Sequence, residues 1–237
     1  MDHPLTGALR QGVLGLGLSL DGAAQAQLLA YMDLIAKWNK VYNLTAVRDA
    51  QEMLTHHLLD SLAVVAPLRR ELAKLVPLQD VSAEAAGPCI TPVPVEAGSP
   101  PYRLLDVGAG AGLPGVVIAI TCPDVLVTCV DTVAKKAAFV QQVAVSLRLP
   151  NLRGLHARVE TLGGPFDVVC SRAFASLPDF TTWSAAALAP HGVWLAMKGK
   201  RPDAEIQALP PSVNVFHVEP LAVPGLDAER CIVWMRG

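Results

Sequence analysis

Residues 102–115 are the part of the chain best suited to hold a ligand, because three glycines follow an apolar run that ends in an acid. The segment reads YRLLDVGAGAGLPG, in which the acid is Asp106 and the glycines are Gly108, Gly110 and Gly112. Glycines in this position permit a tight turn and bring backbone N–H groups close to a ligand. The apolar residues 116–120 predict a helix whose N-terminus completes the pocket. We predict a nucleotide-binding strand, loop and helix, with a ligand-free connection as the alternative.

The acids near these glycines indicate which nucleotide is bound. Gly110, Gly112 and Gly115 match the dinucleotide pattern G-x-G-x-x-G, which alone is a weak signal. The carboxylate of Asp106 would repel a pyrophosphate but would suit a ligand that carries a cationic amino-acid group. Asp131 ends a second apolar run, where an acid that binds ribose hydroxyls is expected; a solvated strand end is the alternative. This combination favours S-adenosylmethionine over NAD.

The residues after a further predicted strand, 166–170, indicate the reaction. Here the chain reads SRAFAS, without the D/N-P-P-aromatic loop of enzymes that methylate exocyclic amines of bases. Cys170 lies inside the predicted strand, which argues against a cysteine nucleophile. Guanine N7 has a lone pair and no proton to lose, so its methylation needs alignment rather than a general base. Arg172 can bond guanine O6 or a phosphate, and Phe174 can stack on the base. A salt bridge from Arg172 to an acid such as Asp179 is the alternative.

The order of the expected elements brings these residues to one edge of a sheet. Strands are predicted near residues 102–106, 125–130, 152–160, 166–170, 193–201, 213–219 and 231–236, and helices near 116–120, 132–149 and 181–189. Alternating strands and helices predict an α/β fold with a mostly parallel, doubly wound sheet. Ligands bind such sheets beyond the carboxyl ends of the strands. We therefore expect one pocket surrounded by Gly108, Asp131, Glu160 and Arg172.

The N-terminal part of the chain is predicted to be helical. After a loose apolar lead-in over residues 1–20, Asp21 is a good N-cap for a helix that runs to about Val41, and a second helix is predicted to begin near Asp49. The first helix runs into KWNKVYNLT, in which Trp38 and Tyr42 either stack on RNA bases or fix the helix to the core. His57 lies on the apolar face of the second helix, which favours a structural role over a catalytic one.

Composition limits the possible partners and cofactors. The net charge of −2 gives no strong attraction for nucleic acid, so RNA binding must rely on local patches. The five cysteines form no C-x-x-C pair and no metal spacing with the histidines, which predicts reduced thiols in the cytoplasm and no metal. Glycines and prolines interrupt the uncharged stretches, so no membrane span is expected. The apolar lead-in is broken by Asp21, which favours a cytoplasmic location over export.

A Pro-rich segment divides the chain. Six prolines, small residues and acids without cations fill residues 77–101, as in an extended linker or surface loop. We predict a helical extension over residues 1–76, a Pro-rich linker or insert over 77–101, and a nucleotide-binding domain over 102–237.

Several segments, in one order, resemble the ribosomal small-subunit methyltransferase G family, also called GidB. They extend from about residue 18 to residue 234 and read KWNKVYNLTAVRD, MLTHHLLDSL, LLDVGAGAGLPG, ARVE, SRAFASL, MKGK and VPGLDAERCIVW. The resemblance implies a Rossmann-like class I S-adenosylmethionine-dependent methyltransferase with a seven-stranded sheet and an N-terminal helical extension. It also implies methylation of guanine N7 at position 527 of 16S rRNA, on the small ribosomal subunit. The insert at residues 77–101 is longer than the family pattern leads us to expect.

The resemblance also assigns site residues. The cofactor contacts of the family carry over to Gly108, Leu113, Val159, Glu160 and Arg172, and we expect Arg172 to be the catalytic residue. To these the physical argument above adds Asp106, Gly110 and Asp131. Candidate RNA contacts, for which a solvated surface is the alternative, are Lys37, Lys40, Phe174, Lys198, Lys200 and Arg201.

For the 16S rRNA methyltransferase we expect a monomer. Two other functions compete with this one. A methyltransferase could act on another RNA, on a protein or on a small molecule. A non-catalytic nucleotide-sensing or cell-division module is the second alternative, and it would tolerate the loss of Arg172.

Overall fold

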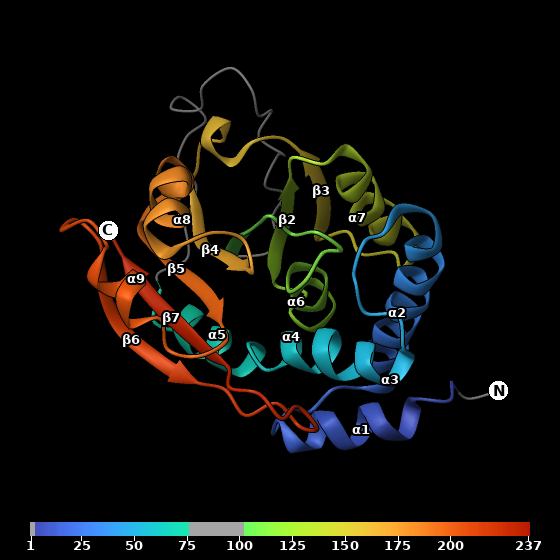
Figure 1. Cartoon of the computed structure of the whole chain (residues 1–237). Helices are drawn as coiled ribbons and strands as arrows, with labels where there is room; N and C mark the ends of the chain where they lie inside the picture. Colours follow the sequence, from blue (N-terminus) through green and yellow to red (C-terminus); the bar gives the residue numbers. More distant parts are fainter. Residues whose placement is uncertain (1–2, 76–101) are drawn as a thin grey trace.

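A seven-stranded sheet with helices on both faces forms the protein, as a computed structural model describes it for residues 3–75 and 102–237 (Figure 1). The spatial order of the strands is β3-β2-β1-β4-β5-β7-β6. All neighbours are parallel except β7, which is antiparallel to both β5 and β6. The strands are β1 (Tyr102–Val107), β2 (Val125–Asp131), β3 (Leu152–His156), β4 (Phe166–Arg172), β5 (Leu188–Lys198), β6 (Asn214–Pro220) and β7 (Cys231–Arg236). The predicted mostly parallel α/β fold is confirmed.

Helices cover the two faces of the sheet unequally (Figure 1). One face carries α1 (Thr6–Gly15), α2 (Gly22–Tyr42), α3 (Ala50–Met53), the π-helix η1 (Leu54–Leu59), α4 (Asp60–Leu62), α5 (Val65–Leu72), α6 (Gly115–Thr121) and α7 (Ala134–Ser146). The other carries the short 3₁₀ turns η3 (Val159–Thr161) and η4 (Ala185–Ala187), with α8 (Leu177–Ser184) and α9 (Asp203–Gln207). The proposed linker, 77–101, lies outside the described residues.

The central strands separate two hydrophobic clusters. Successive side chains of a strand point to opposite faces, so Leu104 packs with the N-terminal helices, and Leu105 packs under α8. Both side chains are completely buried. A strand buried on both sides needs a run of uniformly apolar residues, which is the pattern that predicted β1.

The first 20 residues differ from the prediction of a loose lead-in, because residues Thr6–Gly15 form α1. Leu9 and Val13, one helical turn apart, are buried against the rest of the core. Gly12 lies between them, and a Cβ there would come within 2.5 Å of the Leu59 side chain. The missing side chain lets α1 pack closely on the π-helix. This contact is made in the folded structure and leaves no local signal in the sequence.

The next two helices begin where the sequence indicates. The Asp21 carboxylate accepts a hydrogen bond from the Ala24 N–H at the start of α2 (2.7 Å), as a helix N-cap does. Asp49 caps the second helical stretch and accepts from the N–H groups of Gln51 and Glu52. The stretch then passes through the π-helix η1, an irregularity that often occurs at functional sites.

The helix between β4 and β5 begins and ends earlier than residues 181–189, so its predicted bounds are wrong. Ser176 caps α8 by accepting from the Asp179 N–H (3.2 Å), and Pro178 lies in the first turn. Both residue types are typical of helix starts. β5 accordingly begins at Leu188 rather than at residue 193.

Candidate active site

A cleft of about 400 Å³ opens beyond the carboxyl ends of β1, β2, β3 and β4. The topology changes direction between β1 and β4, which is where ligands bind in such sheets. The volume is that of a small-molecule site. Its lining includes five of the residues expected at the site: Gly108, Asp131, Val159, Glu160 and Phe174. Asp106, Gly110, Leu113 and Arg172 do not line it.

The glycine loop is fixed to the neighbouring strand by its backbone. The N–H groups of Gly108 and Ala109 both donate to the Val130 carbonyl oxygen, at 2.9 and 3.2 Å. Gly108 has φ +67°, and a Cβ there would lie 2.3 Å from the ring of Phe174. Glycine is therefore required at residue 108 both by the turn and by the close approach of the aromatic ring.

Asp131 holds the same loop from the end of β2. Its Oδ2 accepts from the Gly110 N–H (3.0 Å), and its Oδ1 accepts from the Val133 N–H (2.8 Å). The ammonium group of Lys136 lies 3.9 Å from Oδ2. Each carboxylate oxygen keeps a second lone pair, so Asp131 can still accept a ligand hydroxyl. Gly110 does not line the cleft, and it is connected to the site by its hydrogen bond to Asp131.

Asp106 lies beneath the loop, on the side of the sheet that faces α6. Its side chain is completely buried, and Oδ2 accepts from the Gly115 N–H at the start of α6 (2.9 Å). Among the described residues, Oδ1 has no hydrogen-bond partner. Burial raises the pKa of Asp106 to about 7. Leu113 is also buried, so Asp106 and Leu113 support the glycine loop from the interior of the protein and do not line the cleft.

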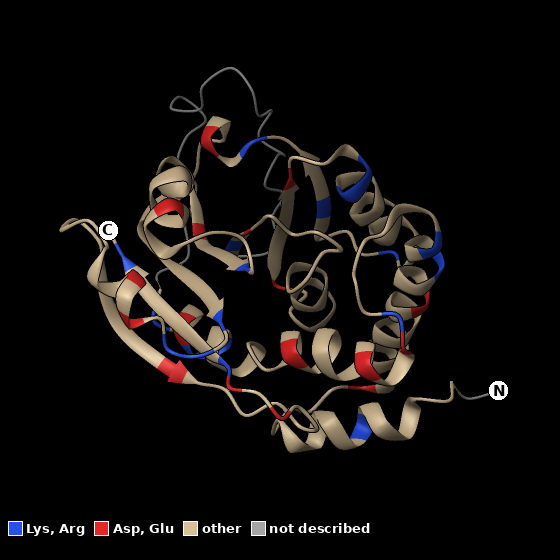
Figure 2. Cartoon of the chain, in the orientation of Figure 1, with Lys and Arg blue, Asp and Glu red and all other residues tan. Residues whose placement is uncertain are grey.

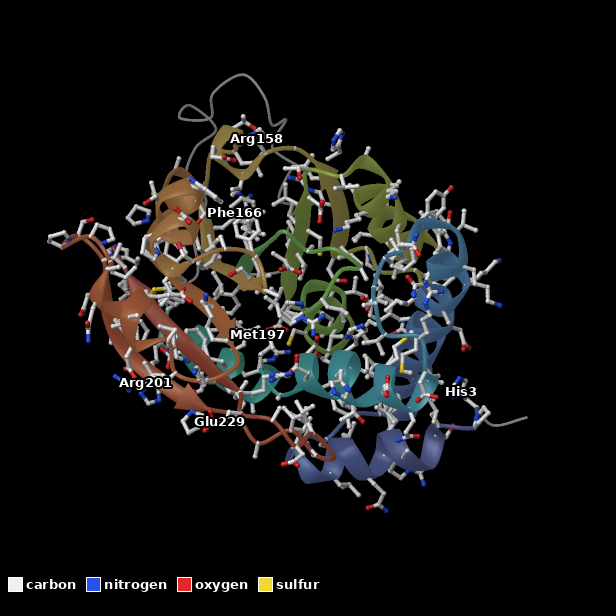
Figure 3. All side chains as sticks on the ribbon, viewed as in Figure 1. His3, Arg158, Phe166, Met197, Arg201 and Glu229 are labelled. Carbon is white, nitrogen blue, oxygen red and sulfur yellow. The ribbon has the colours of Figure 1, made fainter. Side chains whose placement is uncertain are left out.

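The end of β3 supplies the outer wall of the cleft. Val159 is buried, whereas Glu160 is exposed and accepts a hydrogen bond from the Arg158 guanidinium (3.0 Å). Hydrogen bonding to the backbone and to Arg158 lowers the pKa of Glu160, which keeps the carboxylate ionised at neutral pH. Figure 3 shows Arg158 at the upper rim of the molecule.

At the end of β4, the side chains of Arg172 and Phe174 contact different parts of the structure. Ala173 between them has φ +52°, a left-handed conformation that is uncommon outside glycine. Phe174 lines the cleft and meets Trp183 edge-on, with ring centroids 5.9 Å apart. Arg172 donates from Nη1 to Asp60 Oδ2 and to the His56 carbonyl oxygen, both at 3.0 Å. The Arg172 guanidinium is thus bonded to the N-terminal helices, whereas the two residues that follow it in the chain line the cleft.

The acid paired with Arg172 is Asp60 and not Asp179. Asp179 instead accepts from the Ser176 hydroxyl (2.7 Å). Asp60 is only 2% exposed, and its Oδ1 accepts from Arg230 Nε (2.9 Å). Sequence reasoning missed Asp60 and Arg230. A lone acid in the apolar run LLDSL was the available signal, because a buried carboxylate needs a partner.

Trp183 and Tyr31 were also missed. Trp183 is 39% exposed and lines the cleft. Tyr31 is buried in α2, and its hydroxyl donates to the Ala111 carbonyl oxygen of the glycine loop (2.7 Å). Nothing in the sequence around Tyr31 distinguishes it from the other residues of the predicted helix. The N-terminal helices therefore support the loop directly.

The candidate RNA cations are dispersed rather than gathered at the cleft, and Figure 2 shows Lys and Arg on several elements, α2 and α7 among them. Lys37, Lys40 and Lys200 are exposed. Lys198 is partly buried and donates to Glu205 (2.7 Å), and Arg201 donates to Asp203 (2.6 Å). In Figure 3, Arg201 lies well apart from Arg158.

Two residues with open roles have clear structural contacts. The Trp38 ring lies 5.4 Å from the buried Phe139 ring and 5.2 Å from Tyr42, so it fixes α2 to α7. His57 Nε2 is 2.6 Å from the Thr45 hydroxyl, and burial lowers the pKa of His57. Both arrangements agree with the structural interpretation.

A family profile and proteins of similar sequence identify the same family. The profile of the GidB family, described as rRNA small subunit methyltransferase G, matches residues 24–91 and 87–233. A protein of Acidovorax sp. (strain JS42) named "Ribosomal RNA small subunit methyltransferase G" is 65% identical over 97% of this chain and 94% of its own length. One of the same name from Paracidovorax citrulli is 64% identical over 98% and 90%. The crystal structure of TrmN from Thermus thermophilus superposes with a TM-score of 0.48 at 21% identity, over 59% of this chain and 45% of TrmN. Among the described residues, no helix has both the length and the apolar character that a membrane span needs.

Proposed function

Because the chain belongs to the GidB family of rRNA small subunit methyltransferase G proteins, we propose that it transfers a methyl group from S-adenosylmethionine to N7 of guanine 527 in 16S rRNA. The observation that carries this proposal is the extent of the family match, which includes both the N-terminal helices and the sheet. The acceptor atom and its position are those that the family resemblance implies.

The residues at the cleft fit S-adenosylmethionine. The volume of the cleft suits a nucleoside-based ligand. Asp131 ends β2, where an acceptor for ribose hydroxyls is needed. Gly108 has no side chain, so a ligand can approach its backbone closely, although its N–H already donates to the Val130 carbonyl oxygen and is not free for the ligand. Val159 offers apolar surface to an adenine ring. We assign cofactor binding to Gly108, Asp131, Val159 and Glu160, with Asp106, Gly110 and Leu113 maintaining the loop.

The reaction requires alignment more than proton transfer. When bound, S-adenosylmethionine supplies an electrophilic methyl group on a sulfonium. Guanine N7 has a free lone pair and loses no proton on methylation, so no general base is needed. We assign base alignment to Arg172, whose guanidinium can donate to guanine O6. Phe174 can offer its ring to stack against the base.

The groups that would serve another chemistry are buried. Cys170 is completely buried in β4, and burial raises the pKa of its thiol well above the usual value. A covalent mechanism through a thiolate is therefore disfavoured. Asp106 is likewise inaccessible to a substrate. These observations favour an acceptor that needs no activation.

We propose that the protein acts in the cytoplasm on 16S rRNA of the small ribosomal subunit, as a monomer. The exposed Lys37 and Lys40 on α2 are the best candidates to contact the RNA backbone. We also propose that residues 1–76 are a helical extension of the catalytic domain, 102–237.

Mapping of 16S rRNA methylation tests the proposal. RNA from cells without the gene, with the gene, and with the gene restored is analysed by mass spectrometry and primer extension. We expect 7-methylguanine at position 527 to disappear with the gene and to return with it. The proposal is wrong if this modification is unaffected, and a lost methyl group elsewhere in the RNA would assign another target.

A further inference from the structure

Asp60 connects three segments that are far apart in the sequence. It follows the π-helix η1, its Oδ2 accepts from Arg172 Nη1 at the end of β4 (3.0 Å), and its Oδ1 accepts from Arg230 Nε just before β7 (2.9 Å). The Arg172–Asp60–Arg230 cluster therefore joins the N-terminal helices to the parallel strand β4 and to the residue that precedes the antiparallel strand β7.

Asp60 is the buried member of this cluster. The side chain of Asp60 is 3% exposed, whereas those of Arg172 and Arg230 are 20% and 23% exposed. An isolated buried carboxylate is very unfavourable, so Asp60 must remain paired. Two guanidinium groups on one carboxylate leave a net positive charge at the carboxyl edge of β4.

The geometry fixes one end of the Arg172 guanidinium and leaves the other end open. The two hydrogens of Nη1 match two acceptors, Asp60 Oδ2 and the His56 carbonyl oxygen. Within residues 3–75 and 102–237, no protein acceptor is bonded to Nε or Nη2 of this arginine. The next residues along the chain, Ala173 and Phe174, line the cleft. Three donor hydrogens of Arg172 thus have no acceptor among the described residues, directly before the two residues that line the cleft, and Asp60 sets their orientation.

We infer that Asp60 is a positioning residue for methyl transfer, which holds the Arg172 guanidinium so that its open donors meet the target base. This inference rests on the proposed function, because Asp60 acts through Arg172. A fixed guanidinium loses little conformational freedom when the base is bound, and it presents its donors at one angle. Without Asp60, Arg172 would keep the His56 carbonyl as its single anchor.

The test uses the full-length protein, S-adenosylmethionine and small subunits from cells without the gene. The wild type must first methylate position 527, and this result decides the proposed function separately. We then expect Asp60→Asn to lower kcat at least tenfold, with the Kd for S-adenosylmethionine, measured by calorimetry, changed less than threefold. Asp124→Asn is the control, because Asp124 lies just before β2 and its ion pair with Arg69 also joins the N-terminal helices to the sheet, away from the carboxyl ends of the strands. This control should keep its kcat within twofold.

A double-variant comparison separates positioning from a general structural role. Arg172→Lys removes the planar fork, so Asp60→Asn should lower kcat much less in this background than in the wild type. An equal tenfold loss in both backgrounds, or wild-type kcat for Asp60→Asn, would overturn the inference. If Asp60→Asn does not fold, Asp60→Glu decides, since it keeps the charge but displaces the guanidinium. We expect at least a threefold lower kcat with cofactor affinity retained, and an unchanged kcat would reject the role.

Discussion

The cleft and the Arg172–Asp60–Arg230 cluster meet at the end of β4 but are otherwise built from different parts of the chain. The cleft takes Gly108, Asp131 and Glu160 from the ends of β1, the adjacent β2 and the region after β3. The cluster instead brings together residues 60, 172 and 230. In the cleft, most residues follow directly after the strand that carries them, whereas the cluster is held by ion pairs between residues 112 and 170 positions apart.

This difference predicts a division of tasks between the two regions. Changes in the cleft should act on cofactor affinity, because its residues are the ones proposed to bind S-adenosylmethionine. Changes in the cluster should act on the rate of transfer to RNA, because Arg172 is held away from the cleft lining. The following variants test this division.

Replacement of Arg172 should have the largest effect. We expect Arg172→Ala to reduce kcat by about 100-fold or more, as the loss of a preorganised donor does. Asp60 keeps Arg230 as a partner, so the free energy of unfolding should fall by only about 1–3 kcal/mol. Methyl-transfer kinetics and chemical denaturation measure the two effects. Normal turnover would remove Arg172 from the mechanism.

Replacement of the acid at the end of β2 should affect the other region. Asp131→Ala should weaken S-adenosylmethionine binding by roughly 10–100-fold, the worth of a hydrogen bond to a charged group. With saturating cofactor, kcat should change little. Calorimetry gives the affinity, and Asp131→Asn, which keeps an acceptor oxygen, should lose less. Equal affinity for all three proteins would count against ribose binding by Asp131.

The buried acid beneath the glycine loop should make stability depend on pH. The pKa of Asp106 is raised to about 7 in the folded state, so the folded protein binds this proton more tightly than the unfolded chain. Stability should therefore decrease as the pH rises from about 4 to 7, by at most about 1.4 kcal/mol per pH unit. Asp106→Asn should lose this part of the dependence. Urea denaturation at pH 5 and pH 8 shows whether the two proteins differ in this way.

The smallest effect is expected from exposed cations. Lys37→Ala combined with Lys40→Ala should raise KM for the ribosomal substrate a few-fold, leave kcat unchanged and reduce the salt dependence of binding. Lys74→Ala serves as a control, because this lysine is already paired with Glu71 (2.6 Å). If both proteins show the same KM as the wild type, α2 does not contact the RNA backbone.

What the sequence predicts well is local. Glycines behind an apolar run predicted the loop at Gly108, and the end of β2 was recognised from Asp131. The starts of the helices at Asp21 and Asp49 were also predicted, because a helix cap contacts residues only two or three positions away. Such features depend on neighbours in the chain, so a single sequence contains them.

What the sequence does not predict depends on tertiary contacts. No local pattern pairs Asp60 with Arg172 and Arg230, since the pairing exists only once the sheet is assembled. The same holds for Asp106, which had been expected to face the ligand. The alternation of side chains along β1 turns it toward α6 instead. Side-chain direction at a strand end needs the register, which the sequence alone leaves open.

The hydrogen bond from Tyr31 to the Ala111 carbonyl oxygen has a consequence for synthesis on the ribosome. The two residues are 80 positions apart, and the helical partner is made first. The apolar face of α2 therefore leaves the ribosome before the strands and helices that will cover it. Leu28, Met32 and Ile35 belong to the cluster that α6 and α7 complete, so their burial is finished only after residue 146 has been made.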